Sequence, residues 1–88
     1  MTSAKLLTLI PSTEPATWRE FCVDLQDDRP DKGDKAGWRE LFENLEFLEK
    51  SDLVTIERRN GVIEQMILTD LGAERAREAL RKDGYDHG

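Results

Sequence analysis

Cysteine, histidine and long apolar runs are scarce in this chain, and each scarcity excludes a class of protein. The one cysteine, Cys22, cannot form an intramolecular disulfide, which excludes a disulfide-stabilised secreted domain and favours a reducing compartment. No apolar run approaches the ~20 residues of a membrane span. The apolar stretch "KLLTLI" near the start lacks the length and the cleavage site of a signal peptide. We therefore expect a cytoplasmic protein that does not contact a membrane.

Groupings of catalytic or metal-binding side chains are equally scarce. The one histidine, His87, lies near the C-terminus, Cys22 lies on the apolar face of a predicted helix, and no Cys/His pair has zinc-site spacing. The glutamates of residues 40–49 recur at helical spacing, which is typical of a solvated helix face rather than of tuned acid–base groups. We therefore expect no enzymatic activity, no cofactor and no metal site.

Charge is abundant and mostly negative. Of the 88 residues, 36% are charged and 38% are hydrophobic, which is typical of one globular domain with a small core. Lys and Arg number 13 against 19 Asp and Glu, a net charge of -6, and no segment is basic. Nucleic-acid-binding proteins usually carry a basic face, so this balance counts against nucleic acid as a partner.

Apolar periodicity and capping residues predict four helices, at about residues 4–10, 14–26, 37–50 and 70–82, with a frayed tail at 83–88. The first stops at Pro11, which cannot continue a helix. The second has two candidate starts, because Thr17 and Glu20 have capping-box spacing and Thr13 followed by Pro15 is an earlier alternative. Thr69 and Asp70 suit the start of the last helix.

Two of the predicted helices have a clear apolar face. On the second helix this face comprises Trp18, Phe21, Cys22 and Leu25, and on the third it comprises Trp38, Leu41, Phe42, Leu45 and Leu48. We interpret both tryptophans as core residues. Phe47 is exceptional, because it projects from the polar face of the third helix among glutamates. Either the first helix or a loop covers it, or it contacts a protein partner.

A β-hairpin is predicted between the third and fourth helices. Two runs rich in β-branched residues, at 53–59 and 62–68, flank Asn60-Gly61, a strong signal for a tight turn. A two-residue turn would oppose two glutamates, Glu57 and Glu64. We favour a shifted register whose pairs are Arg58 with Glu64, Ile56 with Met66 and Val54 with Leu68.

The segment "DDRPDKGDKAG", residues 27–37, is predicted to be a surface loop. Its Lys32 and Lys35 are candidate phosphate contacts, but aspartates interleave with them and the glycine spacing fits no phosphate-binding motif. A solvated linker is the favoured interpretation, with a contact element as the alternative.

Two stretches resemble winged helix-turn-helix proteins of the MarR and PadR type of bacterial regulator. "FENLEFLEKSDLV", residues 42–54, is similar to the segment joining recognition helix to wing, except that Asp52 stands where those families usually have Gly. "LTDLG", residues 68–72, is similar to the segment after the second wing strand. The resemblance implies an α+β winged helix with three helices, a β-hairpin wing and a C-terminal helix.

The resemblance also implies a function, a small DNA-binding transcriptional regulator that forms a homodimer. Its wing would contact double-stranded DNA through Arg58, Arg59 and Asn60, its recognition helix through Arg39 and Asn44, and its loop through Lys32 and Lys35. The alternative for Arg58 is the cross-strand pair with Glu64. The alternative function is a winged-helix protein-interaction module that uses the acidic third helix and Phe47.

Overall fold

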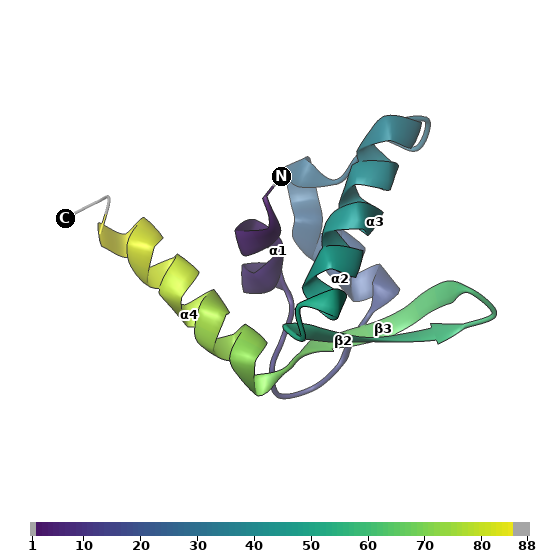
Figure 1. Cartoon of the computed structure of the whole chain (residues 1–88). Helices are drawn as coiled ribbons and strands as arrows, with labels where there is room; N and C mark the ends of the chain where they lie inside the picture. The colour runs from purple at the N-terminus through teal and green to yellow at the C-terminus, as the bar shows by residue number, and fades with distance from the viewer. Residues whose placement is uncertain (1, 86–88) are drawn as a thin grey trace.

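The computed structural model describes the backbone of residues 2–85 and the side chains of residues 2–81. Its elements are α1 (Ser3–Leu9), β1 (Ala16–Thr17), α2 (Trp18–Leu25), η1 (Gln26–Asp28), α3 (Lys35–Lys50), β2 (Val54–Arg59), β3 (Val62–Leu68) and α4 (Asp70–Tyr85). The strands form an antiparallel sheet in the order β1-β3-β2. In Figure 1, α1, α2 and α3 gather on one side of the sheet, the hairpin projects beyond them, and α4 projects the opposite way. The predicted α+β class is confirmed.

The core lies between α1, α2, α3 and the sheet. Its fully buried large side chains are Phe21, Leu6, Leu25, Leu45, Leu48 and Met66. They come from the apolar face of each helix and from the inward face of the sheet, as the periodicity predicts. Among the described residues no polar or charged side chain is buried, so this core consists of apolar packing alone.

The start of α2 is decided between its two candidates. The Thr17 hydroxyl accepts from the Glu20 amide at 3.2 Å, and the Glu20 carboxylate accepts from the Thr17 amide at 3.0 Å, which is a complete capping box. These bonds to the Thr17 backbone and side chain lower the pKa of the Glu20 carboxyl below its ordinary value. The earlier start near residue 14 is wrong, because Ala16 and Thr17 instead pair with Met66 and Gln65 as strand β1.

The register of the hairpin combines the two-residue turn with the inward-facing pairs of the shifted register. The pairs Val54 with Leu68 and Ile56 with Met66 are confirmed, but Arg58 faces Ile63, so the predicted pair of Arg58 with Glu64 is wrong. The register shifts between Glu57 and Arg58, which leaves Glu64 as the extra residue of a bulge. The bulge reconciles a two-residue turn with the inward-facing apolar pairs, and it also avoids the opposition of two glutamates.

A Schellman turn joins α3 to β2. The Leu53 amide donates to the Leu48 carbonyl at 3.0 Å and the Asp52 amide donates to the Glu49 carbonyl at 3.1 Å. Asp52 has φ 62, the left-handed conformation that glycine adopts without strain. The position therefore has the geometry for which the resembling families use glycine, although the residue is aspartate.

We expect Asp52→Gly to stabilise the protein by about 0.5–1 kcal/mol. Left-handed backbone costs an L-residue about 1–2 kcal/mol, and Asp52→Gly would relieve this cost. Glycine is also more flexible in the unfolded chain, which offsets about 0.4–1 kcal/mol of the stabilisation. Urea unfolding followed by circular dichroism measures the difference. Ser51→Gly is the matched control, because Ser51 has φ -83 and relieves no strain, so it should destabilise. Equal effects of the two changes would contradict the assignment.

The start of α4 agrees with the prediction, but its end does not. Thr69 caps α4, since its hydroxyl accepts from the Gly72 amide at 3.0 Å. The helix continues to Tyr85, so the predicted end at residue 82 and the frayed tail at 83–85 are wrong. Residues 86–88, which include His87, lie outside the described residues.

Candidate functional site

The exposed face of α3 carries balanced charge. Its exposed charged residues are Lys35, Arg39, Glu40, Glu43, Glu46 and Lys50. Lys50 Nζ lies 2.9 Å from Glu46 Oε1, and this hydrogen bond lowers the pKa of the Glu46 carboxyl. Lys50 and Glu46 neutralise each other. The other exposed charges of this face are two cations, Lys35 and Arg39, and two anions, Glu40 and Glu43.

Arg39 and Asn44 differ in burial, although the resemblance assigned both to base contacts. Arg39 is exposed on α3. Asn44 is half-buried, and its side-chain oxygen accepts from the Ser3 hydroxyl of α1 at 3.3 Å. The amide of Asn44 therefore contributes to the contact between α1 and α3, and Arg39 is the better placed of the two for an external ligand.

The two arginines of the hairpin also differ. Arg58 donates two hydrogen bonds to the Glu49 carboxylate of α3, at 2.9 and 3.0 Å, and these bonds raise the pKa of its guanidinium above the ordinary value. Arg59 lies 3.8 Å from Glu64, and its side chain is 78% exposed. Asn60, with φ 53, forms the exposed turn beside it. The structure thus directs one arginine to the body and the other to solvent.

The loop before α3 is hydrogen-bonded to that helix at two points. The Trp38 indole Nε1 donates to the Asp31 carbonyl at 2.9 Å, and the Asp34 carboxylate caps α3 by accepting from the Gly37 amide at 3.0 Å. Lys32 and Lys35 are both exposed. The predicted loop of 27–37 is shorter in the structure, because η1 occupies its start and α3 begins at Lys35. The backbone of Asp31 and the side chain of Asp34 therefore both bond to α3.

An aromatic cluster lies where α2, α3 and the β2–β3 hairpin approach one another. The Trp18 and Phe42 rings stack at 5.6 Å, and Trp38 lies 6.4 Å from Trp18. Both tryptophans pack against the core, as interpreted from the sequence, while Phe42 is 44% exposed. A cavity of about 370 Å³ is lined by Trp18 and Phe42 of this cluster and by the hairpin residues Gly61, Val62 and Ile63.

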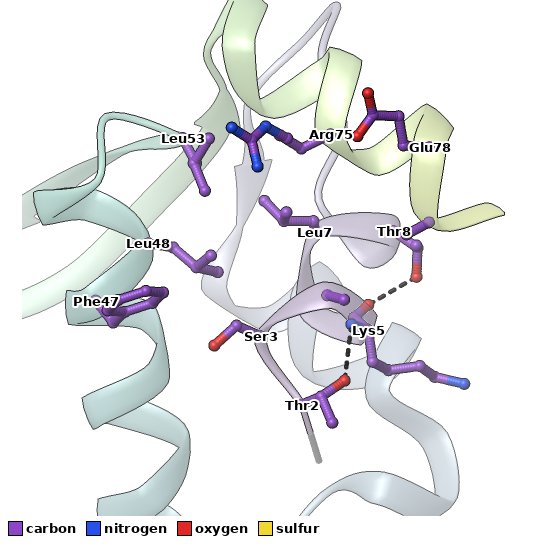
Figure 2. A pocket seen from close by; sticks show the side chains of 12 residues that line it. Thr2, Ser3, Lys5, Leu7, Thr8, Phe47, Leu48, Leu53, Arg75 and Glu78 are labelled. Atoms are coloured by element: carbon purple, nitrogen blue, oxygen red, sulfur yellow. Dashed lines mark hydrogen bonds between the residues drawn. The ribbon is translucent and has the colours of Figure 1, made fainter. Parts of the chain in front are cut away.

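Phe47 lies at a groove between α1, α4 and the C-terminal end of α3. The groove has a volume of about 490 Å³, and Figure 2 shows the side chains of Leu7, Leu48 and Leu53 within it and Phe47 at its α3 side. Lys5, Arg75 and Glu78 stand around it. Phe47 is 58% exposed. The first helix therefore flanks this ring without covering it.

Among the described residues, no group of three or more His, Cys, Asp or Glu side chains is arranged to hold a metal ion. Burial raises the pKa of the Cys22 thiol, which keeps it protonated and weakly nucleophilic. No helix within residues 2–85 has both the length and the apolar character to cross a bilayer.

No family model, curated protein or solved structure matches this chain. A function for this chain is therefore inferred from its own contacts and topology.

Two contacts at the site could not be found by sequence spacing. Glu49 and Arg58 lie nine residues apart across a turn, and Ser3 and Asn44 lie in separate helices. The one available signal was the sign of the charges, because an arginine near a glutamate-rich helix has several candidate partners. The register expected from the sequence paired Arg58 with Glu64 instead.

Proposed function

We propose that this protein is a small winged-helix DNA-binding protein that acts as a transcriptional regulator. The observation that carries the proposal is the projecting hairpin, whose tip presents a solvent-directed arginine, Arg59, after a three-helix unit ending in the amphipathic α3. Three helices followed by a wing and a closing helix is the arrangement that the sequence resemblance implied, and the hairpin in Figure 1 is the element that would serve as the wing.

Three sets of cations support DNA as the ligand. Arg39 is exposed on α3, where an arginine can read guanine in a major groove, and Arg59 is exposed at the wing, where it would meet phosphates or a narrow minor groove. Lys32 and Lys35 lie at the N-terminal end of α3 and would contact the backbone.

The negative charge of the chain should repel DNA less than the composition indicates. Of the glutamates on α3, Glu46 pairs with Lys50 and Glu49 pairs with Arg58. Their charges are neutralised locally, and screening at physiological salt limits the reach of the rest of the surface to about 8 Å. Glu40 and Glu43 remain beside Arg39, and one such carboxylate could accept from cytosine.

The test is fluorescence anisotropy of labelled duplex DNA across a salt series, with random and source-genome sequences. The proposal predicts affinity that falls steeply with salt, since each phosphate contact contributes a slope of about 0.9 in log–log form, and preference among sequences. An absence of binding even at low salt would contradict it.

A second candidate, a protein-interaction module, is favoured by the exposure of Phe47. Monomeric proteins do expose single hydrophobic residues, but an aromatic ring at an apolar groove has the features of an interface anchor. The partner would be a second copy, which gives the expected homodimer, or another protein. The lining of the groove includes neither Arg39 nor Arg59, so the two candidates are compatible.

We expect Phe47→Ala to weaken self-association or partner binding by about thirtyfold, because an interface anchor contributes about 2 kcal/mol. Folding should change little, since the ring is 58% exposed. Sedimentation velocity over a concentration series measures the effect on self-association. Val23→Ala is the control, because Val23 is 64% exposed on α2, away from the groove. Equal association of the wild type and both variants would exclude the groove as a dimer interface.

A further inference from the structure

The pair between Glu49 and Arg58 joins α3 to the hairpin. Arg58 Nη1 lies 2.9 Å from Glu49 Oε2 and Arg58 Nη2 lies 3.0 Å from Glu49 Oε1. This two-bond fork is the geometry in which arginine and carboxylate bind most strongly. Each side chain is partly shielded, at 40% exposed for Arg58 and 32% for Glu49. The two bonds fix both the distance between the side chains and their relative orientation. A single bond from a lysine would not fix the orientation.

The pair lies where the hairpin needs support. The ladder is regular from Val54 to Glu57 and shifts register at the next residue, Arg58. A bulge bends a strand and interrupts its pairing, so the hairpin beyond it is held less firmly by its own ladder. Beyond the bulge, Ile63 packs against the core and Arg58 bonds to α3, while Arg59 and Val62 are exposed. These two attachments hold the tip against the helices.

The same pair makes Arg58 a poor contact for DNA. Its guanidinium already receives from Glu49 the two acceptors that a phosphate would offer. Transfer to a phosphate would leave the Glu49 carboxylate without this partner next to the DNA anion. Arg59 has only a 3.8 Å approach to Glu64 and loses little by turning to a ligand.

We propose that Glu49 is a positioning residue for DNA binding, which holds the wing through Arg58 so that Arg59 meets the phosphate backbone. Arg58 and Glu49 then act as one unit, and Arg59 acts separately. The DNA part of this inference rests on the proposed function, whereas the positioning of the wing does not.

The first experiment uses the protein alone, without DNA. Heteronuclear ¹H–¹⁵N NOE values of the amides from Arg59 to Val62 report the order of the wing tip on the fast timescale. Arg58→Ala and Glu49→Gln should each lower these values. Arg59→Ala should leave the neighbouring amides unchanged, and the charge-swapped double variant Glu49→Arg with Arg58→Glu should restore them. Unchanged values in both Arg58→Ala and Glu49→Gln would overturn the positioning role.

The second experiment measures duplex affinity against salt for the same variants. Arg59→Ala should reduce the salt slope by about 0.9, the value for one phosphate contact. Arg58→Ala and Glu49→Gln should weaken binding about twofold to fivefold, the range for a partly exposed ion pair, at an unchanged slope. The swapped variant should recover wild-type affinity, although Arg58 is gone.

Two results would overturn the DNA part of the inference. A slope that falls in Arg58→Ala as it does in Arg59→Ala would make Arg58 a direct contact. Tighter binding and a steeper slope in Glu49→Gln would show that Glu49 withholds Arg58 from DNA. If the wild type binds no DNA, the proposed function fails while the NOE values still decide whether Glu49 positions the wing.

Discussion

Gly72→Ala is expected to destabilise the protein by about 1–3 kcal/mol, through the close approach of α4 to the start of β2. A Cβ at Gly72 would collide with the backbone carbonyl oxygen of Leu53. That carbonyl accepts from the Thr69 amide at 3.1 Å, and the Leu53 amide donates to Leu48 at 3.0 Å. The backbone at Leu53 therefore cannot move aside without loss of a hydrogen bond that anchors either α4 or the turn after α3.

The sign of this effect is decided by comparing magnitudes. Alanine exceeds glycine in helix propensity by about 1 kcal/mol, which by itself would make Gly72→Ala stabilising. A backbone collision in a packed site costs about 1–3 kcal/mol, and a broken hydrogen bond adds about 1 kcal/mol. For a domain of this size each kcal/mol lowers Tm by about 4–8 °C, so the variant should melt well below the wild type.

Thermal and urea unfolding measured by circular dichroism test this prediction. Gly33→Ala is the matched control, since an added Cβ at Gly33 meets no atom within 4 Å. We expect the control to lie within about 1 kcal/mol of the wild type. A variant Gly72→Ala that is as stable as the control would show that α4 and β2 are further apart than the structure places them.

The double variant Arg39→Glu with Arg59→Glu is expected to lower duplex DNA affinity by on the order of 100-fold or more. Each arginine contact contributes about 1–3 kcal/mol, and each reversal adds repulsion from the phosphates. Both side chains are exposed, so folding should be retained. Anisotropy titrations at low salt measure the loss.

A control with the same change of net charge separates contact from general repulsion. Arg77→Glu with Arg81→Glu alters two exposed arginines on α4, away from Arg39 and the hairpin tip. It should weaken binding several-fold at most, because charges more than about 10 Å from the ligand are screened at 0.1 M salt. Equal losses in both double variants would contradict the assignment of Arg39 and Arg59 as contacts.

The sequence by itself determined the features that depend on neighbours within one turn. The capping box of Thr17 with Glu20 and the cap of Thr69 on Gly72 join residues three apart, so their spacing is visible in the sequence. The turn at Asn60-Gly61 is also local, since both residues have positive φ. The apolar faces of α2 and α3 follow from helical periodicity in the same way. These features sufficed for the α+β class and for the order of the main elements.

Only the tertiary structure decided the contacts between distant segments. The two-residue strand β1 has no periodicity of its own and exists because β3 offers it a free edge. The bulge at Glu64 reflects a compromise between the turn and the buried pairs, and neither alone predicts it. Arg58 reaches Glu49 because α3 lies against the inward side of the hairpin. Local spacing encodes which face of each element is apolar, but the partners of its polar residues depend on how the elements pack, and that is set by the whole core at once.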